Sequence, residues 1–179
     1  MNTQTAILAG GCFWCLEAVY EDMLGVQSVT SGYIDGDVPD PDYELVSTGK
    51  SGYAEAVRIV FDADEVSYRE LLEVFFVIHD PTQLNRQGND IGTQYRSGIY
   101  WLDEAQRQEA ERMVAELAER NAYNAPIVTD VVEAGRFYEA EDYHRAYFRR
   151  HPGQPYCAYV VAPKLEKFRK TFARLKKRA

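Results

Sequence analysis

The sequence predicts a two-layer α+β sandwich in which helices pack on a mixed β-sheet. Segments with the alternating pattern of strands are interleaved with segments of helical spacing, in the order β-α-β-β-α followed by β-α-β. No linker or low-complexity tract divides the 179 residues, which are enough to enclose one substantial core. We therefore expect a single domain over residues 1–179.

The first elements are a strand, a helix and a second strand. Residues 5–9 form a short apolar strand, and two glycines separate it from a helix over 15–24. Gly25 ends that helix, and residues 26–34 are expected to be the second strand. Residues 35–52 are rich in Gly, Asp and Pro, which predicts a loop.

A third strand and a buried helix come next. Apolar and polar residues alternate over 54–61, as in a strand with one buried face. Ser67 and Glu70 have the spacing of a capping box, so a helix is expected to begin there and to end before Pro81. Its many apolar residues require that this helix be largely buried.

The second half of the chain supplies the remaining elements. We expect a polar loop over 81–97, a strand over 98–102, a charged helix over 103–123, a strand over 127–133 and a helix over 142–150. At the centre of this arrangement we expect a ferredoxin-like βαβ core.

The bulk composition indicates an acidic, water-soluble protein. The net charge of −8 argues against nucleic acid as a partner, because such binding depends on Lys and Arg that neutralise phosphates. The exception is the basic segment 164–178, which is interpreted as an amphipathic helix. No apolar run approaches the roughly 20 residues of a membrane span, and the N-terminus lacks the pattern of a signal peptide. We expect a cytoplasmic protein, monomeric by default.

Cys12 is the candidate nucleophile. Three cysteines, an odd number, are an improbable disulfide framework in a reducing compartment, so catalysis or metal binding comes into question. Cys12 follows two glycines at a strand-to-helix turn, where the helix dipole stabilises a thiolate. A pKa lowered from about 8.5 to roughly 6.5 would make most of the thiol reactive at neutral pH.

Cys12 and Cys15 also form a C-x-x-C pair, a spacing that dithiol redox motifs and zinc sites share. The two residues between them are large aromatics, Phe13 and Trp14, whereas small or polar residues are usual in thioredoxin-like sites. These rings either pack in the core or line a pocket for an apolar ligand.

The run GGCFWCLE at 10–17 resembles the opening signature of the A-type peptide methionine sulfoxide reductases. Resemblance is dense from about residue 8 to residue 100. Further segments follow the order of that family, namely SGY at 31–33, YELVSTG at 43–49, GYAEAV at 52–57, HDPTQLNRQGNDIGTQYRS at 79–97, AEDYH at 140–144 and PYC at 155–157.

The resemblance implies an oxidoreductase that repairs oxidative damage by reducing methionine S-sulfoxide, free or in oxidised proteins. Cys12 would attack the sulfoxide sulfur and become a sulfenic acid, which an intramolecular disulfide and then thioredoxin, or another thiol, would reduce. No bound cofactor and no metal are implied. Thioredoxin is the expected protein partner.

The resemblance also assigns groups to the sulfoxide oxygen. Glu55 matches the family's proton donor, and strand alternation independently places it on the buried face, where desolvation raises a carboxyl pKa. Tyr43 and Tyr95 match two phenols that hydrogen-bond the oxygen, with Asp90 supporting them. Phe13 and Trp14 would hold the S-methyl group.

Two thiols are candidates to resolve the sulfenic acid. Cys157 matches the family's distal recycling cysteine, in a C-terminal segment from about residue 150 that is expected to be flexible. Many relatives have glycine where this chain has Cys15, so a local disulfide is the alternative, as first step or as relay. Cys157 is preferred. Tyr53 and Asp35 also depart from the family pattern, which bears on substrate contacts more than on the reaction.

The same residues are compatible with three other functions. A zinc module would use Cys12, Cys15 and Cys157 with His144, but it leaves the segment 79–97 unexplained. A general thiol-disulfide oxidoreductase would use the C-x-x-C pair and leave methionine sulfoxide untouched. A cysteine hydrolase would need a histidine as base, and no oxyanion or histidine-orienting signature lies beside the candidates His79, His144 and His151.

Overall fold

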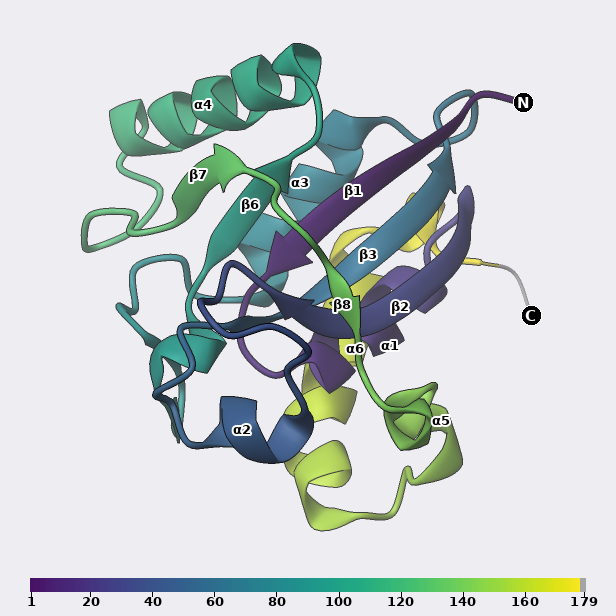
Figure 1. Ribbon diagram of the computed structural model, residues 1–179. Helices are drawn as coiled ribbons and strands as arrows, with labels where there is room; N and C mark the ends of the chain where they lie inside the picture. The colour runs from purple at the N-terminus through teal and green to yellow at the C-terminus, as the bar shows by residue number, and fades with distance from the viewer. Residues whose placement is uncertain (178–179) are drawn as a thin grey trace.

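A computed structural model describes residues 1–177, which form a mixed six-stranded sheet with helices packed on it (Figure 1). The strand order is β7-β6-β1-β3-β2-β8, antiparallel throughout except for the parallel pair β6 and β7. The bounds are β1 Thr3–Ala9, β2 Val26–Ile34, β3 Ala54–Asp62, β6 Gly98–Trp101, β7 Asp130–Glu133 and β8 Tyr138–Glu139.

The four central strands have the predicted ferredoxin-like connection. Helix α1 (Phe13–Glu21) joins β1 to β2, and helix α3 (Tyr68–Ile78) joins β3 to β6. Each crossover skips one position, so β3 lies between β1 and β2 while β1 lies between β3 and β6. The predicted α+β class with a mixed sheet is therefore confirmed.

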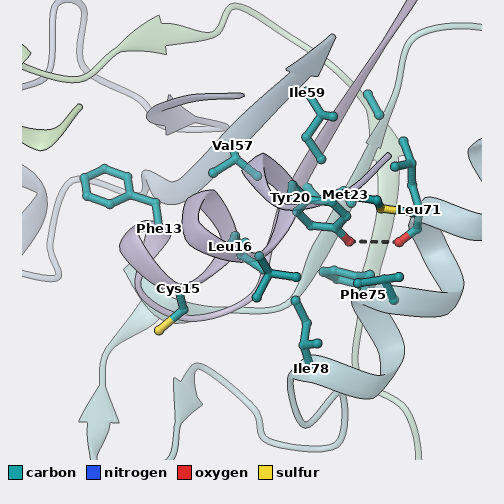
Figure 2. Packing of buried hydrophobic residues seen from close by; sticks show 14 of the residues in the cluster. Phe13, Cys15, Leu16, Tyr20, Met23, Val57, Ile59, Leu71, Phe75 and Ile78 are labelled. Carbon is teal, nitrogen blue, oxygen red and sulfur yellow. Dashed lines mark hydrogen bonds between the residues drawn. The ribbon is translucent and has the colours of Figure 1, made fainter. Parts of the chain in front are cut away.

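The main core lies between the sheet and helices α1 and α3, as Figure 2 shows. Leu16 and Tyr20 of α1 pack with Phe75 of α3, and the Tyr20 hydroxyl donates to the carbonyl oxygen of Leu71 at 2.8 Å. The predicted capping box at Ser67 is present and starts α3. A smaller apolar cluster covers the opposite face of the sheet, where the chain crosses from β7 to β8.

Two segments expected to be loops contain short regular elements. Residues 35–52 include helix α2 (Tyr43–Ser47), which begins where the Asp42 side chain accepts the backbone N–H of Leu45. Residues 81–97 include a hairpin of β4 (Arg86–Gln87) and β5 (Asp90–Ile91), followed by a 3-10 helix, Thr93–Tyr95.

Four expected helices are shifted, shorter or broken. Helix α1 covers Phe13–Glu21 instead of 15–24 and ends before Gly25 is reached. Helix α4 covers Glu104–Glu119 only. The helix expected over 142–150 is instead a 3-10 turn and the short α5 (Tyr147–Arg150), because Ala146 between them is left-handed, with φ 49°. Helix α6 (Ala162–Thr171) ends before Phe172, whose ψ of 48° leaves the helical region. The expected helix end at Arg178 lies outside the described residues.

The C-terminal part of the described chain packs on α1. A π-helix, Cys157–Val161, leads directly into α6, and its Cys157 and Val161 are fully buried. Within residues 1–177, no helix has the length and apolar character that crossing a membrane requires.

Candidate active site

Cys12 occupies the N-cap position of α1, directly after β1. Gly11 before it has φ +91°, and a Cβ there would lie 2.8 Å from the Gln87 side chain. Both the backbone conformation and the space thus require glycine at this position. The turn delivers the Cys12 thiol to the buried start of the helix, with 8% of the residue exposed.

The Glu55 carboxyl faces this helix start from β3. It is 1% exposed, and its Oε1 accepts the backbone N–H of Phe13 at 3.1 Å. The Cys12 thiol lies within its hydrogen-bonding reach. Burial raises the pKa of Glu55 to about 8, with a smaller contribution from Asp90. The predicted burial of Glu55 and the upward direction of its pKa are confirmed.

The sequence analysis predicts a lowered pKa for Cys12, and the direction of this prediction was wrong. Burial raises the pKa of Cys12 well above its usual range, and the neighbouring Glu55 and Cys15 add to the rise. The Trp14 backbone N–H and the Tyr156 hydroxyl lower it by less. The helix start does favour a thiolate, but desolvation outweighs that effect. The resting pair at neutral pH is a thiol beside a carboxylic acid.

Tyr43 and Tyr95 belong to two different elements beside this site. Tyr43 begins α2, and Tyr95 ends the 3-10 helix after β5. Both are partly buried. Burial raises their pKa values, to about 12 for Tyr43, and the charges of Glu55 and Cys12 contribute to both shifts. Both phenols are therefore neutral hydrogen-bond donors across the physiological range.

Asp90 belongs to the site but has a different partner from the one expected. Its Oδ2 accepts a hydrogen bond of 2.5 Å from the Tyr156 hydroxyl, and among residues 1–177 no such bond joins it to Tyr43 or Tyr95. Tyr156 also lies within hydrogen-bonding reach of Cys12 and Cys15. Tyr156 lies in the family segment PYC at 155–157, but no role was predicted for it.

An aromatic wall, formed by Phe13, Trp14, His144 and Tyr147, flanks the site. Phe13 is fully buried, with its ring 4.9 Å from that of His144. Trp14 is half-buried and stacks on Tyr147 at 3.8 Å with nearly parallel planes, while its Nε1 donates to Nδ1 of His144 at 3.0 Å. The two C-terminal members were missed as site residues, although His144 lies in the family segment 140–144.

The three cysteines gather around the first turn of α1. Cys15 is 1% exposed, and its backbone N–H donates to the carbonyl oxygen of Cys12 at 3.1 Å. Burial raises the Cys15 pKa, Lys164 lowers it, and Cys157 adds a small rise. Cys157 is fully buried, and its N–H donates to the Gln154 side chain at 3.0 Å. Cys15 is thus an electrostatic neighbour of both other thiols.

The geometry also bears on the other predicted assignments. In the described part of the chain, no cluster of three or more His, Cys, Asp or Glu side chains is arranged to hold a metal ion, so the zinc set is not assembled. Tyr53 is buried, and its hydroxyl donates to the backbone carbonyl of Val38. It braces the loop before α2. His79 is buried and joined to Phe75 and Ser97 through its two ring nitrogens.

Comparisons with known proteins agree on one family. The sequence profile described as "Peptide methionine sulfoxide reductase" matches residues 4–176. The chain is 56% identical to a peptide methionine sulfoxide reductase MsrA of Polynucleobacter asymbioticus, over 96% of this chain and 90% of the relative. It is 53% identical to that of Deinococcus radiodurans, over 94% and 82%. The reduced form of Mxr1 from Saccharomyces cerevisiae has a TM-score of 0.80 and 33% identity, over 86% of this chain and 88% of that one.

Proposed function

The chain belongs to the peptide methionine sulfoxide reductase family, and on this premise we propose how its own residues carry out the reaction. The chain is an oxidoreductase that reduces methionine sulfoxide to methionine. We assign the chemistry to the neutral pair formed by the Cys12 thiol and the Glu55 carboxylic acid. The observation that carries the assignment is the buried Glu55 carboxyl, with a pKa of about 8, within hydrogen-bonding reach of Cys12.

The reductase step transfers oxygen from the substrate sulfur to Cys12. Glu55 protonates the sulfoxide oxygen as the Cys12 sulfur attacks the substrate sulfur, and the thiol proton returns to the carboxylate. The protonated oxygen then passes from the substrate sulfur to the Cys12 sulfur as the transient sulfur–sulfur bond breaks. The substrate sulfur thereby gains two electrons and leaves as the thioether. Cys12 loses two electrons and becomes a sulfenic acid. The overall change is one thiol and one sulfoxide to one sulfenic acid and one thioether.

The groups around this pair give the substrate one orientation. Tyr43 and Tyr95 donate hydrogen bonds to the oxygen as it acquires charge, which is the direction in which neutral phenols stabilise a transition state. Phe13 and Trp14 contact the S-methyl group. Asp90 acts through Tyr156, whose hydroxyl it holds near the two N-terminal thiols.

Two kinds of group surround the site, hydroxyl donors and apolar rings, and this supports selectivity for the S epimer. The sulfoxide sulfur carries an oxygen, a methyl group, a side-chain methylene and a lone pair, so exchanging oxygen and methyl inverts its configuration. The wrong epimer would direct its oxygen towards apolar rings and its methyl group towards buried donors left unpaired.

Resolution of the sulfenic acid requires a second thiol. From the sequence, Cys157 was the preferred resolving thiol. The position of Cys15 beside Cys12 supports a different order: Cys15 attacks the sulfenic acid first, and Cys157 then exchanges with the disulfide. The first step forms the Cys12–Cys15 bond and releases water, and the second frees Cys12 as a thiol. The segment carrying Cys157 was expected to be flexible; here it is packed on α1, so the relay needs no large movement of that segment.

The remaining assignments concern the protein in its cell. A dithiol protein of the thioredoxin type reduces the final disulfide, and yeast Mxr1, the structural relative described above, forms a complex with Trx2. The substrates are free methionine sulfoxide and oxidised proteins. No bound cofactor takes part in this scheme, because thiols supply the electrons. We further propose a cytoplasmic monomer that works as a single domain.

Measuring turnover with each epimer tests the central proposal. With dithiothreitol as reductant, the wild type should convert methionine S-sulfoxide and leave the R epimer largely unreacted. Cys12→Ser should abolish turnover, whereas Cys157→Ser should retain the first reductase step in a single-turnover measurement. Equal activity of the wild type and Cys12→Ser would contradict the assignment of Cys12 as the reacting thiol.

A further inference from the structure

Glu17 is a buried carboxyl that the chemistry above does not use. It lies on α1, three residues after Trp14, and is only 2% exposed. Burial raises its pKa to about 7, with a further contribution from Glu21. A carboxyl held in such surroundings is expected to have hydrogen-bond partners, and these identify what it does.

The Glu17 carboxyl connects α1 to two other parts of the chain. Its Oε2 accepts from the Ser31 hydroxyl on β2 at 3.3 Å, and its Oε1 accepts from the backbone N–H of Tyr147 at 3.3 Å. The backbone of Ala146 is also within hydrogen-bonding reach. Ala146 is the left-handed residue that breaks the expected helix, a conformation unfavourable for a side chain with a Cβ. The Glu17 carboxyl therefore binds the backbone at the residue whose conformation is unfavourable.

The segment held in this way carries the partners of Trp14. Tyr147 stacks on the Trp14 indole at 3.8 Å, and His144 accepts the indole N–H at 3.0 Å. Trp14 and Glu17 lie one helical turn apart, so the indole and the carboxyl contact the same segment from the same helix. A displacement at Tyr147 would remove the surface against which the indole rests.

We propose that Glu17 is a positioning residue that clamps the segment 144–147 onto α1 and thereby fixes the orientation of Trp14 in the substrate pocket. The proposal rests on the proposed function for the part that concerns substrate. The clamp itself is a statement about Trp14, which spectroscopy tests without any turnover.

The charged groups around the carboxyl pair with one another rather than with Glu17. Glu21 ends α1 and Asp22 follows it, Arg149 comes from α5 and Arg169 from α6, and all four line a cavity of about 220 Å³ beside Glu17. Arg149 pairs with Glu21 at 3.8 Å, and Arg169 pairs with Asp22 at 2.9 Å. Glu17 has no such cationic partner within residues 1–177, so backbone N–H groups and a hydroxyl are what it binds.

Fluorescence of Trp14 provides the first readout. The chain has two tryptophans, so Trp101→Phe leaves Trp14 as the single reporter. In this background Glu17→Ala should shift the Trp14 emission to the red and raise KM about tenfold, the effect of losing one hydrogen bond to a charged group. Glu17→Gln should keep the Trp14 emission and KM at their wild-type values, because the glutamine carbonyl oxygen accepts from Tyr147 and its amide donates to Ser31.

Two comparisons separate a clamp from general damage. Glu21→Ala, a carboxylate removed one turn further along α1, should leave emission and KM unchanged. Tyr147→Ala should reproduce the emission shift, and the double variant Glu17→Ala/Tyr147→Ala should add nothing to it, since Glu17 acts through Tyr147.

Several results would overturn the proposal. Unchanged Trp14 emission in Glu17→Ala, or additive shifts in the double variant, would show that Glu17 does not hold the indole. If Glu17→Ala does not fold, Glu17→Asp, with its carboxyl one methylene shorter, must show the red shift instead, and unchanged emission there has the same consequence. If the wild type does not reduce methionine sulfoxide, only the proposed function is contradicted. The fluorescence result then still tests whether Glu17 holds Trp14 in place.

Discussion

At the residue scale, the proposed reaction depends on the positions of two protons, one on Cys12 and one on Glu55. The same burial that raises the pKa of the thiol raises that of the carboxyl to about 8. A thiol is a weaker nucleophile than a thiolate, but a protonated carboxyl beside it supplies the proton that the sulfoxide oxygen needs. The site therefore favours activation in the presence of substrate over a permanently reactive cysteine, which oxidants would attack.

The pH dependence of the reductase step tests this pairing. The single-turnover rate should fall as pH rises through about 8, because Glu55 then loses the proton it must donate. Glu55→Gln should lower the rate by about 100-fold or more and abolish that fall. Glu44→Gln on the exposed side of α2 is the matched control and should behave as the wild type. A wild-type rate that climbs with pH across this interval would mean that thiolate formation limits the step.

Some of the site could be predicted from single residues, and some could not. Strand alternation was sufficient to bury Glu55, and two glycines before a helix were sufficient to locate Cys12 at its start. The direction of the Cys12 pKa was beyond sequence reasoning, because it depends on the desolvation of the folded site. The partner of Asp90 was also unpredictable, since Tyr156 is 66 residues away and only the folded chain brings them together.

At the scale of elements, the sequence predicted strands better than short helices. Segment 26–34 was predicted with its observed bounds, because Gly25 marks its start and the loop rich in Gly, Asp and Pro marks its end. Helix α2 was missed since the Gly, Asp and Pro content around it outweighs five helical residues. The prediction of a helix over 142–150 was wrong for a different reason. Its local pattern suits a helix, but the tertiary contacts of Glu17 and Trp14 hold Ala146 in a left-handed conformation.

The break at Ala146 gives a stability prediction. Ala146→Gly should stabilise the protein by about 1 kcal/mol, because glycine adopts the left-handed region without the penalty that a Cβ incurs. Urea unfolding monitored by circular dichroism measures the change. Ala115→Gly in the exposed middle of α4 should be destabilised by a similar amount, since there the conformation is helical. A loss of stability in Ala146→Gly would show that the left-handed conformation is not the dominant cost at this position.

At the scale of the whole molecule, the fold brings the first helix and the C-terminal part of the described chain together. Cys12 and Cys15 lie at the start of α1, whereas Cys157 comes more than 140 residues later, in the π-helix that leads into α6 and contacts α1. Figure 1 shows α6 beside α1. The ferredoxin-like core holds α1 rigidly through Tyr20 and α3, so the later segment is positioned relative to a fixed helix. This arrangement supports the proposed relay of thiols along the first turn of α1.

The order of disulfides formed after a single turnover tests this relay. After one equivalent of methionine sulfoxide without reductant, the wild type should contain Cys15–Cys157, and Cys157→Ser should stop at Cys12–Cys15. Cys15→Ser should accumulate the Cys12 sulfenic acid, trapped with dimedone, and form any Cys12–Cys157 bond about tenfold more slowly or worse, because the intervening nucleophile is missing. Peptide mapping by mass spectrometry identifies each bond. If Cys12–Cys157 forms in Cys15→Ser as fast as the wild type forms its own disulfide, Cys157 attacks directly and Cys15 is a bystander.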